Sequence, residues 1–495
     1  METAMNLRQG KGPKHRVAGV LLTLLVTLTG CSLGTGASPG QTSVSEGPAP
    51  AGKAPAGTLA TPRAETPADQ VQTIGGFGVN ANVHSWKGGQ LKPAIDQIAA
   101  LGQLTWRVII DRADWEPARH GDDPAVYDWT YYAGIYEHGK MADLWNTIAY
   151  INSKPGQQVM INVMGGVPDW MGGTRIDPGM EDYWVRMISS MVYYGRTIRK
   201  LNFTLLGPMN ETDYNGIEGP KVDPEQYVRL LHKLSDRLDT LGLRDIRFVG
   251  PDTASQEQAA SNYLPALARD PVVMAKMAHF GIHSYDGGTS GTAGKLNDSG
   301  YPNLDLWVTE FSGPCPGCDS GAPNPSDWES AAATADDALR LLQEGASGLQ
   351  FYDAWDGYYE HHGSVGYWGA LAYDPGTGSY TPRKSYFILK QLFSFVPRGS
   401  VRVAASSTND TVDVVAFKDP SSGRLTVVGR NTGSAKINIR ITIAGIPGET
   451  VLQNYRTDAD SNMVSDPGTS LKAGIISLQT EPNALFTLTG IPSAS

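Results

Sequence analysis

Two glutamates of this 495-residue chain each close a short run of apolar residues. The first run ends as GPMNE at Glu211, and the second ends as WVTE at Glu310. A pair of opposed carboxyl groups can cleave a glycosidic bond when one gives a proton to the leaving oxygen and the other, ionised, attacks the anomeric carbon. Mutual repulsion helps to separate the pKa values of such a pair. The chemistry requires that these two distant residues meet in space.

Eight apolar, β-branched runs alternate with amphipathic stretches over residues 71–397 and are predicted to be strands. They are Gly76–Asn80, Thr105–Ile110, Gln158–Val163, Phe203–Leu206, Arg247–Gly250, His279–Ile282, Leu306–Thr309 and Gly348–Tyr352. The clearest helix follows the fourth run, with Asp223 as N-cap, Pro224 at its first position and apolar residues along one face to Leu238.

This alternation predicts an α/β fold, a closed parallel (β/α)8 or TIM barrel, with an open doubly wound sheet as the rival. In such a barrel the chemistry takes place where the strands end. Strands four and seven face each other across the mouth, so Glu211 and Glu310 are expected to meet there.

The C-terminal residues 398–495 have a different pattern. Short alternating runs, such as Val412–Phe417 and Ile437–Ile443, lie between turns rich in Asn, Asp, Gly and Ser, with no convincing helix. This pattern predicts an antiparallel β-sandwich as an accessory domain.

At the strand ends that carry Glu211 and Glu310, the chain resembles the retaining glycoside hydrolases of clan A. The members of this clan have a (β/α)8 barrel, an Asn-Glu pair at the end of strand four and a second Glu at the end of strand seven. The resemblance covers roughly residues 71–397. It implies that Glu211 is the general acid/base and Glu310 the nucleophile, and that Asn210 binds the sugar 2-hydroxyl.

Other positions match the clan as well. Arg107 is similar to the strand-two arginine that orients the nucleophile, and the sequence His283-Ser284-Tyr285 is similar to a His-x-Tyr motif whose tyrosine bonds Glu310. Trp355 is similar to the tryptophan that forms the floor of the sugar subsite. The residues themselves leave open a core role for His283 and core packing for Trp355.

The family within the clan is not resolved by the sequence. The segment IGGFG at 74–78 is similar to family 30 and VPDW at 167–170 to family 39. Many family 5 members have a histidine near the end of strand three, where this chain has MGG at 164–166. Trp170 is expected either to form the floor of a distal sugar subsite or to pack in the core.

The N-terminus has the layout of an export signal. Basic residues between positions 8 and 16 precede the apolar run Val17–Thr29, and LTGC resembles the bacterial lipobox, in which the cysteine is diacylated. We therefore expect residues 1–30 to be a lipoprotein signal peptide and Cys31 the lipidated residue, with a plain signal peptide as the alternative. Residues 31–70, rich in Ala, Pro, Gly, Ser and Thr, are expected to be a flexible linker. The expected location is the bacterial cell surface or envelope.

Cys315 and Cys318 are expected to close a small disulfide loop, with free thiols as the second interpretation. The segment Glu360-His361-His362 has no third ligand at helical spacing, so a loop is favoured over a metal site. No metal or cofactor is expected. The net charge of −10 and the lack of a basic cluster after the signal region argue against a nucleic-acid partner.

The sequence thus predicts a retaining glycoside hydrolase that cleaves β-glycosidic bonds of a poly- or oligosaccharide by double displacement. Its two carboxyl groups are expected to lie about 5 Å apart. A non-catalytic carbohydrate-binding lipoprotein of the cell surface is the alternative, and a transglycosylase would use the same residues.

Overall fold

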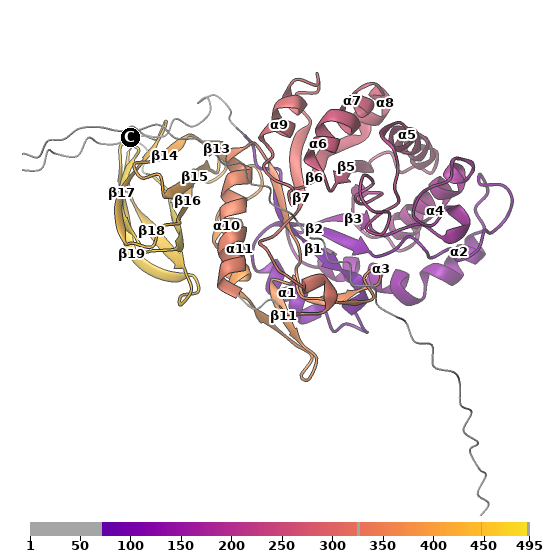
Figure 1. Ribbon diagram of the computed structural model, residues 1–495, viewed down its shortest axis with the longest axis horizontal. Coiled ribbons are helices and arrows are strands. Elements are labelled where there is room, and N and C mark those ends of the chain that lie inside the picture. Colours follow the sequence, from indigo (N-terminus) through magenta and orange to yellow (C-terminus); the bar gives the residue numbers. More distant parts are fainter. Residues whose placement is uncertain (1–71, 324–326, 447, 493–495) are drawn as a thin grey trace, which may run out of the picture. The chain divides into compact units, whose positions relative to one another are not determined.

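The computed structural model describes residues 72–323, 327–446 and 448–492. Figure 1 shows these residues as ribbons. The predicted signal peptide, the linker and Cys31 lie outside the described residues. Among the described residues, no helix is long and apolar enough to cross a membrane.

Eight parallel strands form a closed barrel in the order of the sequence. The strands are β1 (Gly76–Asn82), β2 (Leu104–Ile110), β3 (Gln158–Val163), β4 (Leu205–Gly207), β5 (Arg247–Thr253), β6 (Met277–His283), β7 (Asp305–Phe311) and β8 (Gly348–Phe351). The first strand pairs with the last, Gly76 lying opposite Gly348, so the sheet closes on itself. The predicted (β/α)8 barrel is confirmed, and the open doubly wound sheet is excluded.

The helices lie mainly between the barrel strands. They are α1 (Lys92–Ala99), α2 (Trp129–Tyr136), α3 (Gly139–Asn152), α4 (Glu181–Tyr193), α5 (Pro224–Thr240), α6 (Gln256–Gln258), α7 (Leu264–Ala268), α8 (Pro271–Lys276), α9 (Ser290–Asn297), α10 (Asp327–Gln343) and α11 (Lys384–Phe393). Helix α5 begins as the sequence predicts, because the Asp223 carboxylate accepts a hydrogen bond from the backbone N–H of Gln226 at 2.8 Å.

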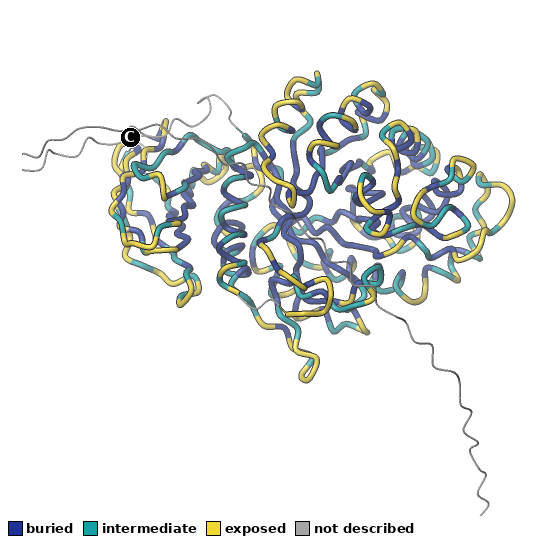
Figure 2. The backbone as a smooth tube through the Cα atoms, in the orientation of Figure 1, coloured by how far each residue is buried: buried dark blue, intermediate teal, exposed yellow. Residues whose placement is uncertain are grey.

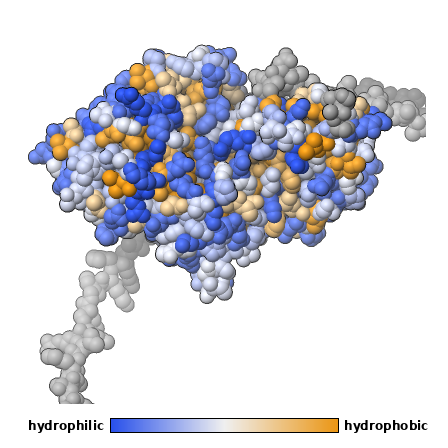
Figure 3. Space-filling view, turned by 180° about the vertical axis from the view of Figure 1, so that it is seen from behind, coloured by the Kyte–Doolittle hydropathy of each residue, from blue (hydrophilic) through white to orange (hydrophobic). Residues whose placement is uncertain are grey.

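Burial follows the layered pattern of a barrel. Every residue of β1 and β2 is buried, as expected for parallel strands that are covered on both faces. In Figure 2 the barrel strands run as buried tube, while exposed residues gather on the loops and the outer sides of the helices. Figure 3 shows polar residues interspersed with small apolar patches on the opposite face of the molecule.

The chain after β8 forms two small hairpins before α11. Strand β9 (Gly357–Tyr359) pairs with β10 (Ser364–Gly366), and β11 (Leu371–Asp374) pairs with β12 (Ser379–Pro382). Both hairpins follow the C-terminal end of β8, which is the end of the barrel where active sites are found.

The C-terminal domain is an all-β sandwich, as predicted. Its strands are β13 (Val401–Val403), β14 (Ala405–Ser407), β15 (Val412–Lys418), β16 (Leu425–Asn431), β17 (Ile437–Ile443), β18 (Glu449–Thr457), β19 (Val464–Lys472), β20 (Ile475–Thr480) and β21 (Ala484–Gly490). Strand β15 separates two apolar clusters. Val414 and Ala416 pack in the sandwich core, whereas Val415 and Phe417 belong to the cluster that includes the barrel helices.

Candidate active site

The two glutamates meet at the C-terminal end of the barrel. Glu211 lies in the loop that follows β4, and Glu310 lies near the end of β7. Both residues are buried, with 7% and 4% of their surface exposed. One carboxylate oxygen of Glu211 and one of Glu310 lie within 4.8 Å of each other. An approach this close is in the range of carboxyl pairs that act on one sugar carbon from opposite sides.

His283, at the end of β6, lies between the two glutamates and is fully buried. Its Nδ1 atom lies 2.8 Å from Oε1 of Glu211, and its Nε2 atom lies 3.5 Å from Oε1 of Glu310. Burial alone would lower the pKa of His283, but the two negative charges raise it. The ring therefore contacts both carboxyl groups and is more than a packed core residue.

Glu211 has a backbone conformation that is uncommon for a residue with a side chain. Its φ angle is +37°, and its N–H donates to the backbone oxygen of Asp252 at 2.8 Å. Burial raises the pKa of Glu211, and the charges of Glu310 and Glu218 raise it further, against the opposing hydrogen bond to His283. The environment thus favours the protonated form that a general acid requires.

Arg107, in the middle of β2, is fully buried, and its guanidinium group bonds residues of β1, β5, β7 and the loop after β4. Its Nη1 donates to Asn80 Oδ1 at 2.7 Å and to Oε1 of Glu310. Its Nη2 donates to Asn210 Oδ1 at 2.6 Å and to Asp252 Oδ2 at 3.2 Å. The arginine therefore holds Glu310 and Asn210 in fixed positions and provides a direct counter-charge for Glu310.

Tyr285 and Asn210 complete the immediate surroundings of the pair. The Tyr285 hydroxyl donates to Oε2 of Glu310 at 3.3 Å, while 49% of the residue is exposed, so its ring lies at the surface of the site. Burial of the hydroxyl and the charge of Glu310 raise the pKa of Tyr285. The Asn210 amide nitrogen donates to the backbone oxygen of Glu218 at 3.1 Å, which uses one of its two hydrogens.

Comparison with known proteins adds the family context. Residues 399–472 match the model of the glycosyl hydrolase family 30 beta sandwich domain. No curated protein matches the chain. The structure resembles that of a GH30 endoxylanase from Clostridium papyrosolvens C71, at 17% identity and a TM-score of 0.65, over 86% of this chain and 98% of that one. It also resembles the GH30 subfamily 8 xylanase from Clostridium acetobutylicum, at 17% identity and a TM-score of 0.64, over 85% and 96%.

The fold is that of clan A. The resemblance predicted from the sequence is therefore confirmed, and family 30 is the family named both by the matched sandwich domain and by these two structures. The structure also resembles that of an endo-β-1,6-glucanase, at 16% identity and a TM-score of 0.62, over 86% of this chain and 94% of that one. At such low identity these structures establish the fold alone.

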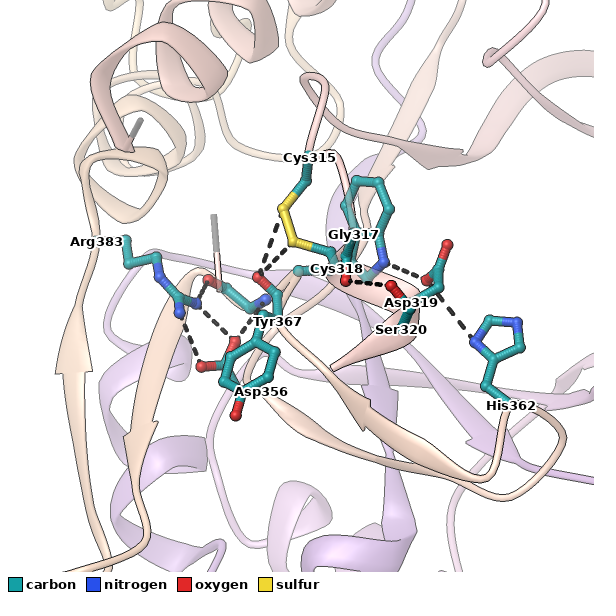
Figure 4. The surroundings of a disulfide bond; sticks show 11 residues. Cys315, Gly317, Cys318, Asp319, Ser320, Asp356, His362, Tyr367 and Arg383 are labelled. Carbon is teal, nitrogen blue, oxygen red and sulfur yellow. Dashed lines mark hydrogen bonds and ion pairs between the residues drawn. A yellow bond between two sulfur atoms is a disulfide. The ribbon is translucent and has the colours of Figure 1, made fainter. Parts of the chain in front are cut away.

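The structure corrects the expectation that Trp355 is a clan A sugar platform. Trp355 is fully buried, its Nε1 donates to the backbone oxygen of Asn82 at 3.2 Å, and its ring packs near Trp106. The nearby Asp353 and Asp356 are buried as well. Asp356 accepts two hydrogen bonds from Arg383, at 2.6 and 2.8 Å (Figure 4).

Tyr352 is an aromatic residue directly after β8, and its surroundings include Glu310. It is buried, with 7% of its surface exposed, and it packs with Ile109, Met164 and Tyr359 at the end of the barrel. Burial and the nearby negative charges, that of Glu310 among them, raise the pKa of the Tyr352 hydroxyl. Of the two residues, Tyr352 and not the buried Trp355 thus has Glu310 among its electrostatic neighbours.

Trp170 follows β3 and is partly buried. Its Nε1 donates to the backbone oxygen of Glu116 at 2.7 Å, and its ring packs edge to face with Tyr183. These contacts agree with the core-packing alternative and do not join Trp170 to the two glutamates.

Cys315 and Cys318 form a disulfide in the loop after β7 (Figure 4). The backbone oxygen of Tyr367 lies 3.3 Å from the sulfur of Cys318, and the N–H of Tyr367 donates to the backbone oxygen of Cys318 at 3.2 Å. The closed loop is thus attached to the segment after β10.

Asp252 is a residue of the site that sequence analysis missed. It is fully buried near the end of β5, and its carboxylate accepts hydrogen bonds from Arg107, from Asn162 at 3.2 Å and from Thr309 at 2.8 Å. The segment GPDT closes the fifth strand run, so the rule that selected Glu211 and Glu310, a polar residue where a strand ends, would also have selected Asp252.

Proposed function

We propose that this chain is a retaining glycoside hydrolase that cleaves β-glycosidic bonds of a poly- or oligosaccharide. The proposal depends on one observation. A carboxylate oxygen of Glu211 and one of Glu310 lie within 4.8 Å of each other, across the mouth of a clan A barrel. Retaining enzymes have carboxyl groups about 5–5.5 Å apart, and inverting enzymes have them about 6.5–9.5 Å apart.

The unequal surroundings of the two residues support their separate roles. Glu310 has the guanidinium of Arg107 as a direct partner, which suits a nucleophile that must carry a negative charge. Burial raises the pKa of Glu211, which suits a residue that must hold a proton until the leaving oxygen takes it.

The reaction proceeds by two displacements. In the first, a carboxylate oxygen of Glu310 bonds to the anomeric carbon, the bond from that carbon to the leaving oxygen breaks, and the proton of Glu211 passes to that oxygen. In the second, Glu211 takes a proton from water, the water oxygen bonds to the anomeric carbon, and the bond to Glu310 breaks. Two inversions restore the starting configuration.

The substrate class is proposed from the relatives. Their names describe xylanases and an endo-β-1,6-glucanase, so xylan and β-1,6-glucan are the first polysaccharides to test. Tyr285 and Tyr352 are proposed to contact the sugar beside Glu310. The ring of Tyr285 is half exposed at the surface of the site, and that of Tyr352 is buried near Glu310.

The anomer released first tests the proposal. The purified chain should hydrolyse at least one β-linked polysaccharide in a panel of xylans, β-glucans, mannans and galactans, and proton NMR of early products should show the β-anomer before mutarotation. Release of the α-anomer would show inversion and overturn the role of Glu310. Binding of sugar without any cleavage would instead identify a carbohydrate-binding lipoprotein.

The pH dependence of kcat/KM tests the role of Glu211. Hydrolysis requires the protonated form of Glu211. Because the pKa of Glu211 is raised, this form is still present at a higher pH than for an ordinary carboxyl group. Activity should therefore persist above the usual carboxyl range and be lost as the pH rises through the pKa of Glu211. Glu211→Ala should remove this alkaline limb and lower kcat/KM by at least about 100-fold on a natural glycoside.

A nitrophenyl glycoside should lose much less activity in Glu211→Ala, because its leaving group departs without a proton. Glu257→Ala, which removes an exposed carboxylate at the start of α6, is the control and should retain the alkaline limb. An unchanged pH profile in Glu211→Ala would contradict the assignment.

We also propose that the enzyme is exported and attached to the membrane by a lipid on Cys31. The support is the lipobox-like LTGC after an apolar run, followed by a linker that would let the folded part reach its substrate. A Cys31→Ser chain that still fractionates with membranes would contradict this anchor.

A further inference from the structure

A second cluster of titratable side chains lies beside the two glutamates. His361 and His362 occupy the turn between β9 and β10, and Glu218 lies in the loop between β4 and α5, 144 residues before His362. The Nε2 atom of His361 lies 2.8 Å from Oε2 of Glu218, and the Nε2 atom of His362 lies 3.0 Å from its Oε1. One nitrogen or oxygen of each residue lies within 4.8 Å of the others.

The contacts of His361 define which of its nitrogens can act as a ligand. Its Nδ1 lies 2.7 Å from Oδ1 of Asp111, and a carboxylate only accepts, so Nδ1 carries a hydrogen. In the neutral ring, Nε2 then presents a lone pair to Glu218. This Nε2 atom is buried, the side chain is 2% exposed, and the atom makes no hydrogen bond of standard geometry. Two lone pairs 2.8 Å apart repel each other unless a proton or a metal ion lies between them.

His362 lies on the other side of Glu218, and its second nitrogen makes no direct hydrogen bond. Its Nδ1 lies 3.7 Å from Oδ1 of Asp319, the residue after Cys318 in the disulfide loop (Figure 4). His361 thus has a hydrogen-bonded carboxylate behind the nitrogen that faces away from Glu218, and His362 has a carboxylate near that nitrogen without a direct hydrogen bond. Carboxylates in this position orient histidines that bind metal ions and increase their basicity.

We propose that Glu218, His361 and His362 bind a divalent transition metal ion, with Zn²⁺ as the simplest case. Two imidazole nitrogens and one carboxylate oxygen are a common ligand set for zinc, with the fourth position left to water. His362 lines a surface pocket of about 580 Å³ with Gly317, Asp319, Ser320 and Ser364, which gives the ion a route of entry.

The bound ion would connect two loops at the mouth of the barrel. The backbone oxygen of Glu218 accepts hydrogen bonds from the Asn210 side chain at 3.1 Å and from the N–H of Gly165 at 2.7 Å. An ion held by Glu218 would therefore attach the β9–β10 hairpin to the loop that carries Asn210 and Glu211. This role does not depend on the reaction proposed above.

The neighbouring group of His84, Asp111 and Glu360 does not offer an equivalent site. The Lys140 ammonium lies 3.0 Å from Oε2 of Glu360 and already provides a positive charge there.

A proton competes with the metal ion for the site formed by Glu218, His361 and His362. A metal ion binds the unprotonated nitrogen of a histidine, so metal binding should release any proton held between His361 and Glu218 and strengthen as the pH rises.

Metal content of the purified full chain tests the proposal. After treatment with a chelator and equilibrium dialysis against Zn²⁺, the chain should retain one equivalent by elemental analysis. His362→Gln and Glu218→Gln should each bind at least about 100-fold more weakly, since one of three ligands is lost. Asp319→Asn keeps all three ligands and should weaken binding by less than about 10-fold, since Asp319 makes no direct hydrogen bond to His362. His232→Gln is the matched control. His232 lies on helix α5, is paired with Asp270 and is not one of the three proposed ligands, so this variant should bind Zn²⁺ normally.

Two measurements on the unaltered chain guard against variants that do not fold. At a free Zn²⁺ concentration about 100 times the Kd, the Tm should rise by about 3 °C. Co²⁺ should give the strong visible absorption of a four-coordinate site. Failure to retain any equivalent of Zn²⁺ or Co²⁺ would show that a proton alone occupies the site. Equal Zn²⁺ affinity in His362→Gln and His232→Gln would place any bound ion elsewhere.

Discussion

Glu310→Gln should abolish hydrolysis, lowering kcat by at least about 10,000-fold while the chain remains folded. The amide is nearly the same size as the carboxylate but cannot form the covalent bond to the anomeric carbon. It also leaves Arg107 with Asp252, so the arginine keeps one buried counter-charge. Turnover would be measured with the preferred polysaccharide, and folding would be checked by circular dichroism.

Azide separates loss of the nucleophile from general damage. Glu310→Ala leaves a space where the carboxylate stood, and azide can enter it and attack the anomeric carbon in a single displacement. The product should be a glycosyl azide of inverted configuration. Glu211→Ala provides the contrast, because azide there attacks the covalent intermediate and gives a product of retained configuration. Unchanged hydrolysis in Glu310→Gln would end the double-displacement account.

Arg107→Met should lower the free energy of unfolding by about 3–5 kcal/mol and abolish activity. The methionine fills much of the same space, but it leaves the carboxylates of Glu310 and Asp252 buried without their common cation. Removing one partner from a buried ion pair is costly because the remaining charge has no solvent to compensate it. Urea unfolding followed by tryptophan fluorescence would measure the change.

Arg269→Met is the control for this effect of burial. Arg269 pairs with Glu225 at 3.0 Å, and both side chains are two-thirds exposed. Loss of an exposed pair costs about 0–1 kcal/mol. If Arg107→Met and Arg269→Met changed the free energy of unfolding equally, the network around Arg107 would not have the structural weight assigned to it.

The barrel could be predicted from the sequence because its signals are local. Each buried parallel strand is a continuous apolar run, and helix α5 has an N-cap, a proline and a 3.6-residue period. The sandwich strands β18, β19 and β20 were not predicted, because one face of each is exposed and polar residues interrupt the alternation. In β19 only Leu471 is buried.

Within the site, Glu211 and Glu310 could be predicted because they lie at strand ends. Some of the charged residues that surround them, such as Asp252, were not predicted. The segment around Trp355 looks polar, yet Asp356 is buried because Arg383, 27 residues later, satisfies both of its oxygens. Glu218 likewise meets His361 only through the fold. Such pairings depend on tertiary contacts, which neither periodicity nor composition encodes.

The double role of strand β15 has a consequence for how this protein can be divided. Val415 and Phe417 belong to the apolar cluster that also includes residues of α10 and α11, and the Gln391 side chain on α11 donates to the backbone oxygen of Tyr455 at 3.1 Å. A chain cut after the barrel would expose this covering to water and leave that amide without its acceptor. The sandwich is therefore part of the same folded unit as the barrel, and the barrel without it should be less stable.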